Sequence, residues 1–192
     1  MRKSLGYEIF MTALVLVIIA GVAGALLGLV NNFTHEDESK VIIRKANAFY
    51  GAELKKDEGI GADVDGVVDV LRPMEEGKNT YVLIVRGTGA YKGSLDLFVN
   101  ITDAEIVKIA VYEANETPGL GSKALKENYF EQYYHKKITS DFSGFDLVKR
   151  PKARDDEVSA VTGASKSSTA VTNAVNAAVK WYKTVVLGGV SA

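Results

Sequence analysis

Residues 81–112 read YVLIVRGTGAYKGSLDLFVNITDAEIVKIAVY, and this stretch contains three of four runs that are typical of β-strands. The four runs cover residues 67–71, 81–85, 95–101 and 106–112. A turn begins at Asn100–Asp103, between the last two runs. Short connections join antiparallel neighbours, whereas parallel neighbours need a long crossover. The sequence therefore predicts an antiparallel sheet.

Helical patterns lie on both sides of these strands. Residues 37–50 have apolar positions near helical spacing and are predicted as an amphipathic helix, followed by a glycine-rich, charged loop over 51–66. Two more helices are predicted over 122–134 and 167–186. The last helix has one apolar stripe, formed by Val171, Val175, Ala178, Tyr182 and Val185. The predicted fold class is α+β, with an antiparallel sheet and a long C-terminal helix.

The N-terminal part of the chain is much more apolar than the rest. Ile9–Val30 is a run of 22 residues without a charge, long enough at about 1.5 Å per residue to cross a hydrocarbon core of about 30 Å. Two interpretations compete, a cleaved signal peptide and a retained anchor. Ala23–Ala25 resembles a cleavage site, yet the apolar run continues beyond it and exceeds the usual signal-peptide core of about 7–15 residues. We favour the anchor.

Charges beside the apolar run indicate its orientation. Arg2 and Lys3 precede it, and the acidic segment His35–Glu38 follows it. The positive-inside rule then predicts a single-pass protein of the cytoplasmic membrane with a cytoplasmic N-terminus. We expect residues 1–32 to form the transmembrane anchor and residues 33–192 to form one extracytoplasmic domain.

Composition excludes several classes of function. The chain has 23 Lys and Arg against 24 Asp and Glu, so its formal charge of -1 provides no global positive field for nucleic acid. It has no cysteine, which excludes disulfides, thiolate nucleophiles and cysteine-ligated metal sites in this chain. Its two histidines, His35 and His135, lie in no ligand cluster, so we expect no metal site.

Two glycine-rich segments follow predicted strands. The first, Gly87–Gly93, reads GTGAYKG and invites a dinucleotide-binding interpretation. Its third glycine is one residue late, and the next segment alternates as a strand where that fingerprint needs a helix, so a bend or bulge is favoured. The second, Glu116–Gly121, reads ETPGLG. It is either a connector or a loop whose backbone approaches a flat ligand closely.

A third segment precedes the long C-terminal helix. Residues 159–169 read SAVTGASKSST and combine small residues with hydroxyl groups. They expose a nucleophilic oxygen and leave the first N–H groups of the helix free to bind an anion such as phosphate. The alternative is an ordinary helix start, capped by Ser165, Ser167 or Ser168.

These features in this order resemble a known family. The N-terminal anchor, the GTGAYKG segment, the ETPGLG loop and the TGAS segment at 162–165 extend over nearly the whole chain. Together they resemble the FMN-binding G subunit of the Rnf complex and the similar C subunit of the sodium-translocating NADH:quinone oxidoreductase. The pairing of ETPGLG with TGAS is the specific part of this resemblance.

The resemblance implies a membrane-anchored electron-transfer flavoprotein within an ion-translocating ferredoxin:NAD oxidoreductase complex, with the other membrane subunits as partners. It implies FMN attached as a phosphoester by a separate flavin transferase, on Ser165. Residues implied around the phosphate are Thr162, Gly163, Ala164, Ser167 and Ser168. Those implied beside the isoalloxazine are Glu116, Thr117, Pro118, Gly119, Leu120 and Gly121.

The chain departs from the family's usual pattern at two positions. Ser165 stands where threonine is usual, and Ser159 stands where aspartate is usual. A competing hypothesis is a non-catalytic bitopic protein that assembles a complex or binds a ligand without covalent flavin. A hydrolase using one of the clustered serines is disfavoured, because the sequence offers no plausible base.

Overall fold

The computed structural model describes residues 5–34, 37–57, 64–75 and 79–188. Its contacts divide the chain into two units, Met1–Val41 and Ile42–Ala192. The first unit consists mainly of α1, Leu5–Thr34, whose described side chains are exposed on every side. Within it, Gly6–Asn32 has a mean hydropathy of 2.8 and is long and apolar enough to cross a membrane.

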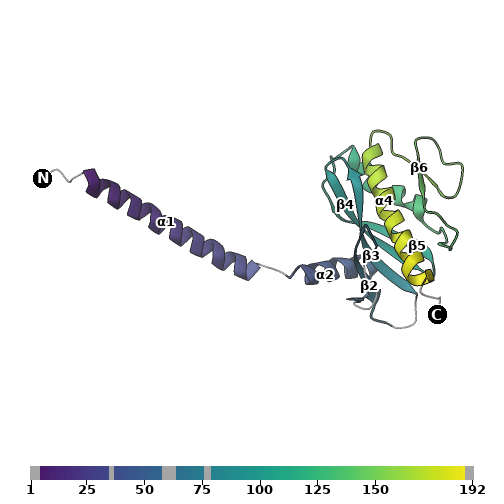
Figure 1. Cartoon of the computed structure of the whole chain (residues 1–192), viewed down its shortest axis with the longest axis horizontal. Coiled ribbons are helices and arrows are strands. Elements are labelled where there is room, and N and C mark those ends of the chain that lie inside the picture. Colours follow the sequence, from purple (N-terminus) through teal and green to yellow (C-terminus); the bar gives the residue numbers. More distant parts are fainter. Residues whose placement is uncertain (1–4, 35–36, 58–63, 76–78, 189–192) are drawn as a thin grey trace. The chain divides into compact units, whose positions relative to one another are not determined.

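The second unit contains a five-stranded antiparallel sheet in the order β1-β2-β3-β4-β5 (Figure 1). The strands are β1 (Leu54–Lys56), β2 (Val67–Pro73), β3 (Thr80–Ala90), β4 (Gly93–Thr102) and β5 (Glu105–Ala114). The four predicted strands and their antiparallel pairing are confirmed. The loop predicted over 51–66 is wrong at β1, because Leu54 is buried and pairs with Pro73. Three residues are too few to show an alternating pattern.

Two-residue turns join β3 to β4 and β4 to β5. The first is Tyr91-Lys92, preceded by a bulge at Gly89, where φ is +93°. This bulge confirms the favoured interpretation of the GTGAYKG segment. The second is Asp103-Ala104, with φ values of 50° and 68°, as a hairpin turn with two left-handed residues requires.

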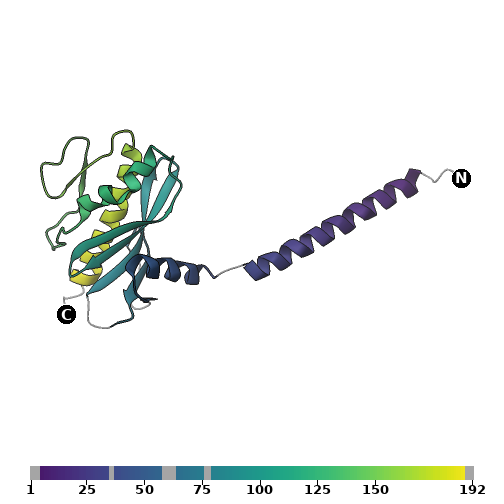
Figure 2. The same ribbon diagram turned by 180° about the vertical axis from the view of Figure 1, so that it is seen from behind.

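Helix α4, Ser165–Trp181, packs across one face of the sheet (Figures 1 and 2). Val171, Val175 and Ala178 of the predicted stripe are fully buried there, and the helix continues as a π-helix over Tyr182–Leu187. At Gly87 a Cβ would overlap the carbonyl oxygen of Ala170. This glycine therefore allows β3 and the first turns of α4 to approach each other.

Helix α2, Glu38–Tyr50, uses its residues from Ile42 onward to cover the opposite face. Phe49 stacks on Phe98 of β4 with ring centroids 5.4 Å apart, and Ala46 is fully buried. The Nζ of Lys108 donates to the Phe49 carbonyl at 2.7 Å, near the C-terminal end of α2. The sheet thus has an apolar layer on each side.

The segment between β5 and α4 is less regular than predicted. The helix expected over 122–134 is divided into the 3₁₀ turn η1 (Gly121–Leu125), the short α3 (Glu127–Phe130) and η2 (Glu131–Tyr133). It breaks at Lys126, whose backbone is extended with φ -97° and ψ 152°. The prediction of one continuous helix is therefore wrong, while the helical character of its parts is confirmed.

A small parallel pair, β6 (Asp146–Val148) with β7 (Glu157–Ser159), leads into α4 and was not predicted. Its loop closes on the buried Glu157 side chain, which accepts two hydrogen bonds from Arg150, at 2.8 and 2.7 Å. The Arg150 hydrogen bonds, helped by the Ala153 N–H, lower the pKa of Glu157 to about 2. This ion pair holds the chain that approaches the start of α4.

Candidate functional site

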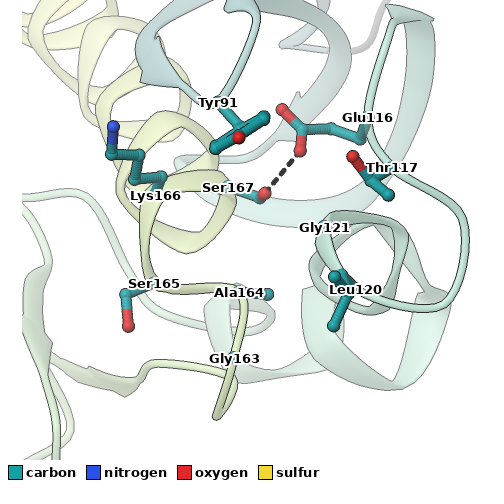
Figure 3. A pocket seen from close by; sticks show the side chains of 10 residues that line it. All are labelled: Tyr91, Glu116, Thr117, Leu120, Gly121, Gly163, Ala164, Ser165, Lys166 and Ser167. Carbon is teal, nitrogen blue, oxygen red and sulfur yellow. Dashed lines mark hydrogen bonds between the residues drawn. The ribbon is translucent and has the colours of Figure 1, made fainter.

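A cavity of about 550 Å³ lies at the N-terminal end of α4 (Figure 3). Three segments that are distant in sequence line it: the tip of the β3–β4 hairpin, the ETPGLG loop and the first turn of α4. The lining residues are Tyr91, Glu116, Thr117, Leu120, Gly121, Gly163, Ala164, Ser165, Lys166 and Ser167. Pockets of about 300–1,000 Å³ are typical of cofactor and small-molecule sites.

The first turn of α4 presents backbone donors at this cavity. Ala164 is the N-cap residue and makes no side-chain capping hydrogen bond, and the N–H of Ser168 donates to its carbonyl at 2.9 Å. The N–H groups of Ser165, Lys166 and Ser167 precede this first intrahelical bond, so the helix itself gives them no acceptor. Such an end favours a bound anion.

The serines predicted as possible caps have different environments. Ser165 is exposed, whereas Ser167 and Ser168 are buried. The Oγ of Ser168 accepts a hydrogen bond from the Val161 N–H at 3.1 Å, and the Oγ of Ser167 donates to Glu116 at 2.7 Å. Of these three hydroxyls, only that of Ser165 is at an exposed residue. The capping alternative is wrong, because the N-cap is Ala164.

The ETPGLG loop is joined to α4 by the hydrogen bond from Ser167 to Glu116 Oε2, drawn as a dashed line in Figure 3. Gly121 lies close to both side chains of this bond. A Cβ at Gly121 would overlap Glu116 Oε2 and lie 2.7 Å from Ser167 Oγ. The glycine at this position therefore makes room for a contact between side chains of two segments.

The structure brings most of the sequence-predicted site residues to the cavity. The ones that line it are Glu116, Thr117, Leu120, Gly121, Gly163, Ala164, Ser165 and Ser167. Four others lie outside its lining: Thr162, Ser168, Pro118 and Gly119. Gly119 has a φ of +77° and its N–H donates to Ser122 Oγ at 3.0 Å, so this residue shapes the loop.

Two lining residues were missed by the sequence analysis, Tyr91 and Lys166. Tyr91 is 67% exposed at the hairpin tip, and the Nζ of Lys166 lies 5.6 Å from its ring centroid. The hairpin is held to α4 by a hydrogen bond from Asn173 Nδ2 to the Thr88 carbonyl, at 2.9 Å. For Tyr91, the sequence offered one signal, an aromatic residue within the GTGAYKG segment. Only the tertiary structure places this residue beside α4.

The histidines contribute nothing to this cavity's described lining. His135 has an 80% exposed side chain, 4.0 Å from Glu105, and His35 lies outside the described residues. Within the part of the chain that the structure describes, no group of three His, Cys, Asp or Glu side chains could hold a metal ion.

Residues 90–180, which include the whole lining of the cavity, match the family described as FMN-binding domain. This part of the chain is similar to FMN-binding domains. The donor set fits this cofactor, because exposed backbone donors suit its phosphate and the largely apolar walls suit its flat ring. Leu120 and Tyr91 supply the exposed apolar surface at the mouth of the cavity.

Two relatives are G subunits of ferredoxin:NAD(+) oxidoreductase complexes. A proton-translocating one from Clostridium ljungdahlii is 28% identical over 79% of this chain and 74% of its own length. A Na(+)-translocating one from Acetobacterium woodii is 27% identical over 91% of this chain and 92% of its own. These matches confirm the resemblance inferred from the ETPGLG and TGAS segments.

Among solved structures, the C subunit of the Na(+)-translocating NADH-quinone reductase from Parabacteroides distasonis has a similar fold. The TM-score is 0.50 and the sequence identity is 23%. The match covers 59% of this chain and 60% of that protein. This similarity supports the α+β fold of the domain.

Proposed function

We propose that this protein is the flavin-carrying electron-transfer subunit of an ion-translocating ferredoxin:NAD(+) oxidoreductase complex in a membrane. One observation carries the proposal: the FMN-binding domain has its ten-residue cavity at a helix N-terminus, next to an exposed serine. The two relatives, each named as the G subunit of such a complex, support the assignment. The partners of this protein are then the other membrane subunits.

We propose that the FMN phosphate is bound covalently to Ser165. The hydroxyl is exposed, and the N–H groups of Ser165, Lys166 and Ser167 stabilise the negative phosphate oxygens. The new bond joins Ser165 Oγ to phosphorus, while the hydroxyl proton and a leaving group on phosphorus depart. A flavin nucleotide activated by such a leaving group is therefore the donor, and a separate flavin transferase catalyses the step.

The remaining residues of the cavity hold and orient the cofactor. Gly163, with a φ of +80°, turns the chain into α4 without a side chain in the cavity, and Leu120 and Tyr91 cover the apolar ring. The bound flavin supplies reversible electron uptake, and the protein fixes its position and tunes its potential. No substrate-activating base is needed for this role.

The apolar helix α1 anchors the protein, and the charges beside it orient the chain. We propose that the N-terminus lies in the cytoplasm and that the flavin domain lies on the other side of the cytoplasmic membrane. Labelling of Lys40 in intact cells by a membrane-impermeant amine reagent tests this topology. Labelling only after the cytoplasm is opened contradicts it.

Substitution of Ser165 tests the attachment. The full-length chain is coexpressed with a flavin transferase, and peptide mass spectrometry locates the added flavin phosphate. Ser165→Ala should carry none, whereas Ser165→Thr keeps an oxygen and should remain modified. Modification at Ser167, Ser168 or Thr169 refutes the site. Absence of covalent flavin in the wild type leaves the non-covalent ligand-binding protein as the better hypothesis.

A further inference from the structure

Two side chains of opposite charge line the cavity, Glu116 and Lys166 (Figure 3). Neither is needed to form the ester at Ser165 or to cover an apolar ring. A charge beside a flavin changes its reduction potential, because reduction adds negative charge to the ring system. The two residues therefore act in opposite directions, and their relative strength depends on how each is held.

The carboxylate of Glu116 is held in one place. Its Oε2 accepts the hydrogen bond from Ser167, whose side chain is only 2% exposed and is fixed in the first turn of α4. Gly121 leaves the space in which the carboxylate lies, since a Cβ there would overlap Oε2. Glu116 itself is partly buried. Its charge is therefore fixed in position and is only partly screened by water.

The ammonium group of Lys166 is held much less firmly. Lys166 is exposed, and its contact with another lining residue is the cation–π contact to Tyr91, at 5.6 Å from the ring centroid. Exposed cation–π and ionic contacts of this kind are weak, and salt screens them. Of the two charged side chains, Glu116 therefore has the stronger effect inside the cavity.

We propose that Glu116, positioned by Ser167, sets a low reduction potential for the flavin bound in this cavity. The relevant couple is oxidised flavin plus two electrons and one proton, which gives the singly charged reduced flavin. The carboxylate opposes the negative charge that this uptake leaves on the ring. A low reduction potential allows the flavin to exchange electrons with other carriers of low reduction potential. This inference rests on the proposed function, because it assumes that flavin occupies the cavity.

Three variants of the full-length chain, flavinylated by coexpression and purified in detergent, test the inference in reductive titrations with dithionite and a reference dye. Glu116→Gln removes the charge and keeps a hydrogen-bond acceptor. At a fixed potential, it should raise the ratio of reduced to oxidised flavin at least about tenfold, or about 30 mV in a two-electron couple. Ser167→Ala keeps the charge and frees the carboxylate, so its shift should have the same sign and be smaller.

Lys166→Gln is the matched control. It removes the other charge of the cavity, and its shift should be under about twofold, of opposite sign, and absent in 1 M salt. The shift caused by Glu116→Gln should persist in that salt. A Lys166→Gln shift as large as that of Glu116→Gln overturns the assignment of the dominant charge.

Flavin content at Ser165 is measured first, so that two failures are distinguishable. A wild-type chain without flavin contradicts the proposed function. Flavin-bearing variants with wild-type potentials overturn only the present inference. If Glu116→Gln carries no flavin, the potential of Ser167→Ala is the deciding measurement. Lower thermal stability with an unchanged potential would show that the hydrogen bond has a purely structural role, and would overturn the inference.

Discussion

The two glycine-rich segments of this protein are similar in composition, but their glycines have different structural roles. In the GTGAYKG segment, Gly87 meets the backbone of Ala170 and Gly89 forms a bulge, so the glycines serve the packing of β3 on α4. In the ETPGLG segment, Gly121 makes room for the bond between Glu116 and Ser167 at the cavity. A glycine-rich loop is therefore informative only when the atoms opposite each glycine are known.

The largest effect is expected at Gly87. In Gly87→Ala the new methyl group overlaps the Ala170 carbonyl, a backbone atom that cannot move aside alone. The free energy of unfolding should fall by about 1–3 kcal/mol or more, as in overpacked cores. Denaturant unfolding of the full-length chain in detergent measures it. A variant as stable as the wild type would mean that β3 and α4 are farther apart than described.

The ion pair of Glu157 lies outside both glycine-rich segments, and its effect on stability should depend on pH. The Glu157 pKa of about 2 lies below the unfolded value near 4.5, so the ion pair stabilises the fold above about pH 4.5. That contribution should be lost as the pH falls from 4.5 toward 2. Glu157→Gln should lower stability at pH 7 and flatten this part of the pH profile. Thermal unfolding of the wild type and of Glu157→Gln between pH 2 and pH 7 checks this. Melting temperatures that change with pH in parallel for the two proteins would contradict the prediction.

Gly121→Ala should affect the flavin's reduction potential more than the stability of the fold, which is the opposite of what is expected for Gly87→Ala. The atoms that a Cβ would meet are the ends of two side chains, which can move, so we expect a stability loss below about 1 kcal/mol. Because the carboxylate of Glu116 is displaced, the flavin's potential should shift toward that of Glu116→Gln. Matched unfolding and redox titrations of Gly87→Ala and Gly121→Ala test the contrast. If both variants changed stability and reduction potential in the same way, the contrast between the two glycines would be contradicted.

The smallest effect on the flavin is expected at Gly119. Among the described residues, apart from its two chain neighbours, no atom lies within 4 Å of an added Cβ there, so Gly119→Ala meets only the strain of its φ of +77°. That strain costs about 1–2 kcal/mol when the backbone holds, and an exposed loop can relax part of it. The flavin absorbance spectrum should change little. A large spectral change would mean that the backbone at Gly119 touches the ring.

The sequence predicted the regular part of the fold and much of the site. Alternating and helical patterns were enough for β2 to β5 and for α4, because each is long and buries one face. Local patterns failed at β1 and at Lys126, where pairing and packing with distant residues decide the backbone. The resemblance carried by the TGAS and ETPGLG segments named eight of the ten residues that line the cavity. Tyr91 was missed, since its proximity to the site arises only from tertiary packing. Lys166 was missed although it lies between Ser165 and Ser167 in sequence.

The hydrogen bond from Asn173 to the Thr88 carbonyl connects positions 85 residues apart. The hairpin tip therefore reaches the start of α4 only after the sheet and the helix have assembled, and the cavity does not exist in the unfolded chain. A ligand that binds only the native state shifts the folding equilibrium by mass action. Free FMN retained in this cavity would thus raise the melting temperature in a concentration-dependent way, and cofactor loading would report on completed folding of the domain.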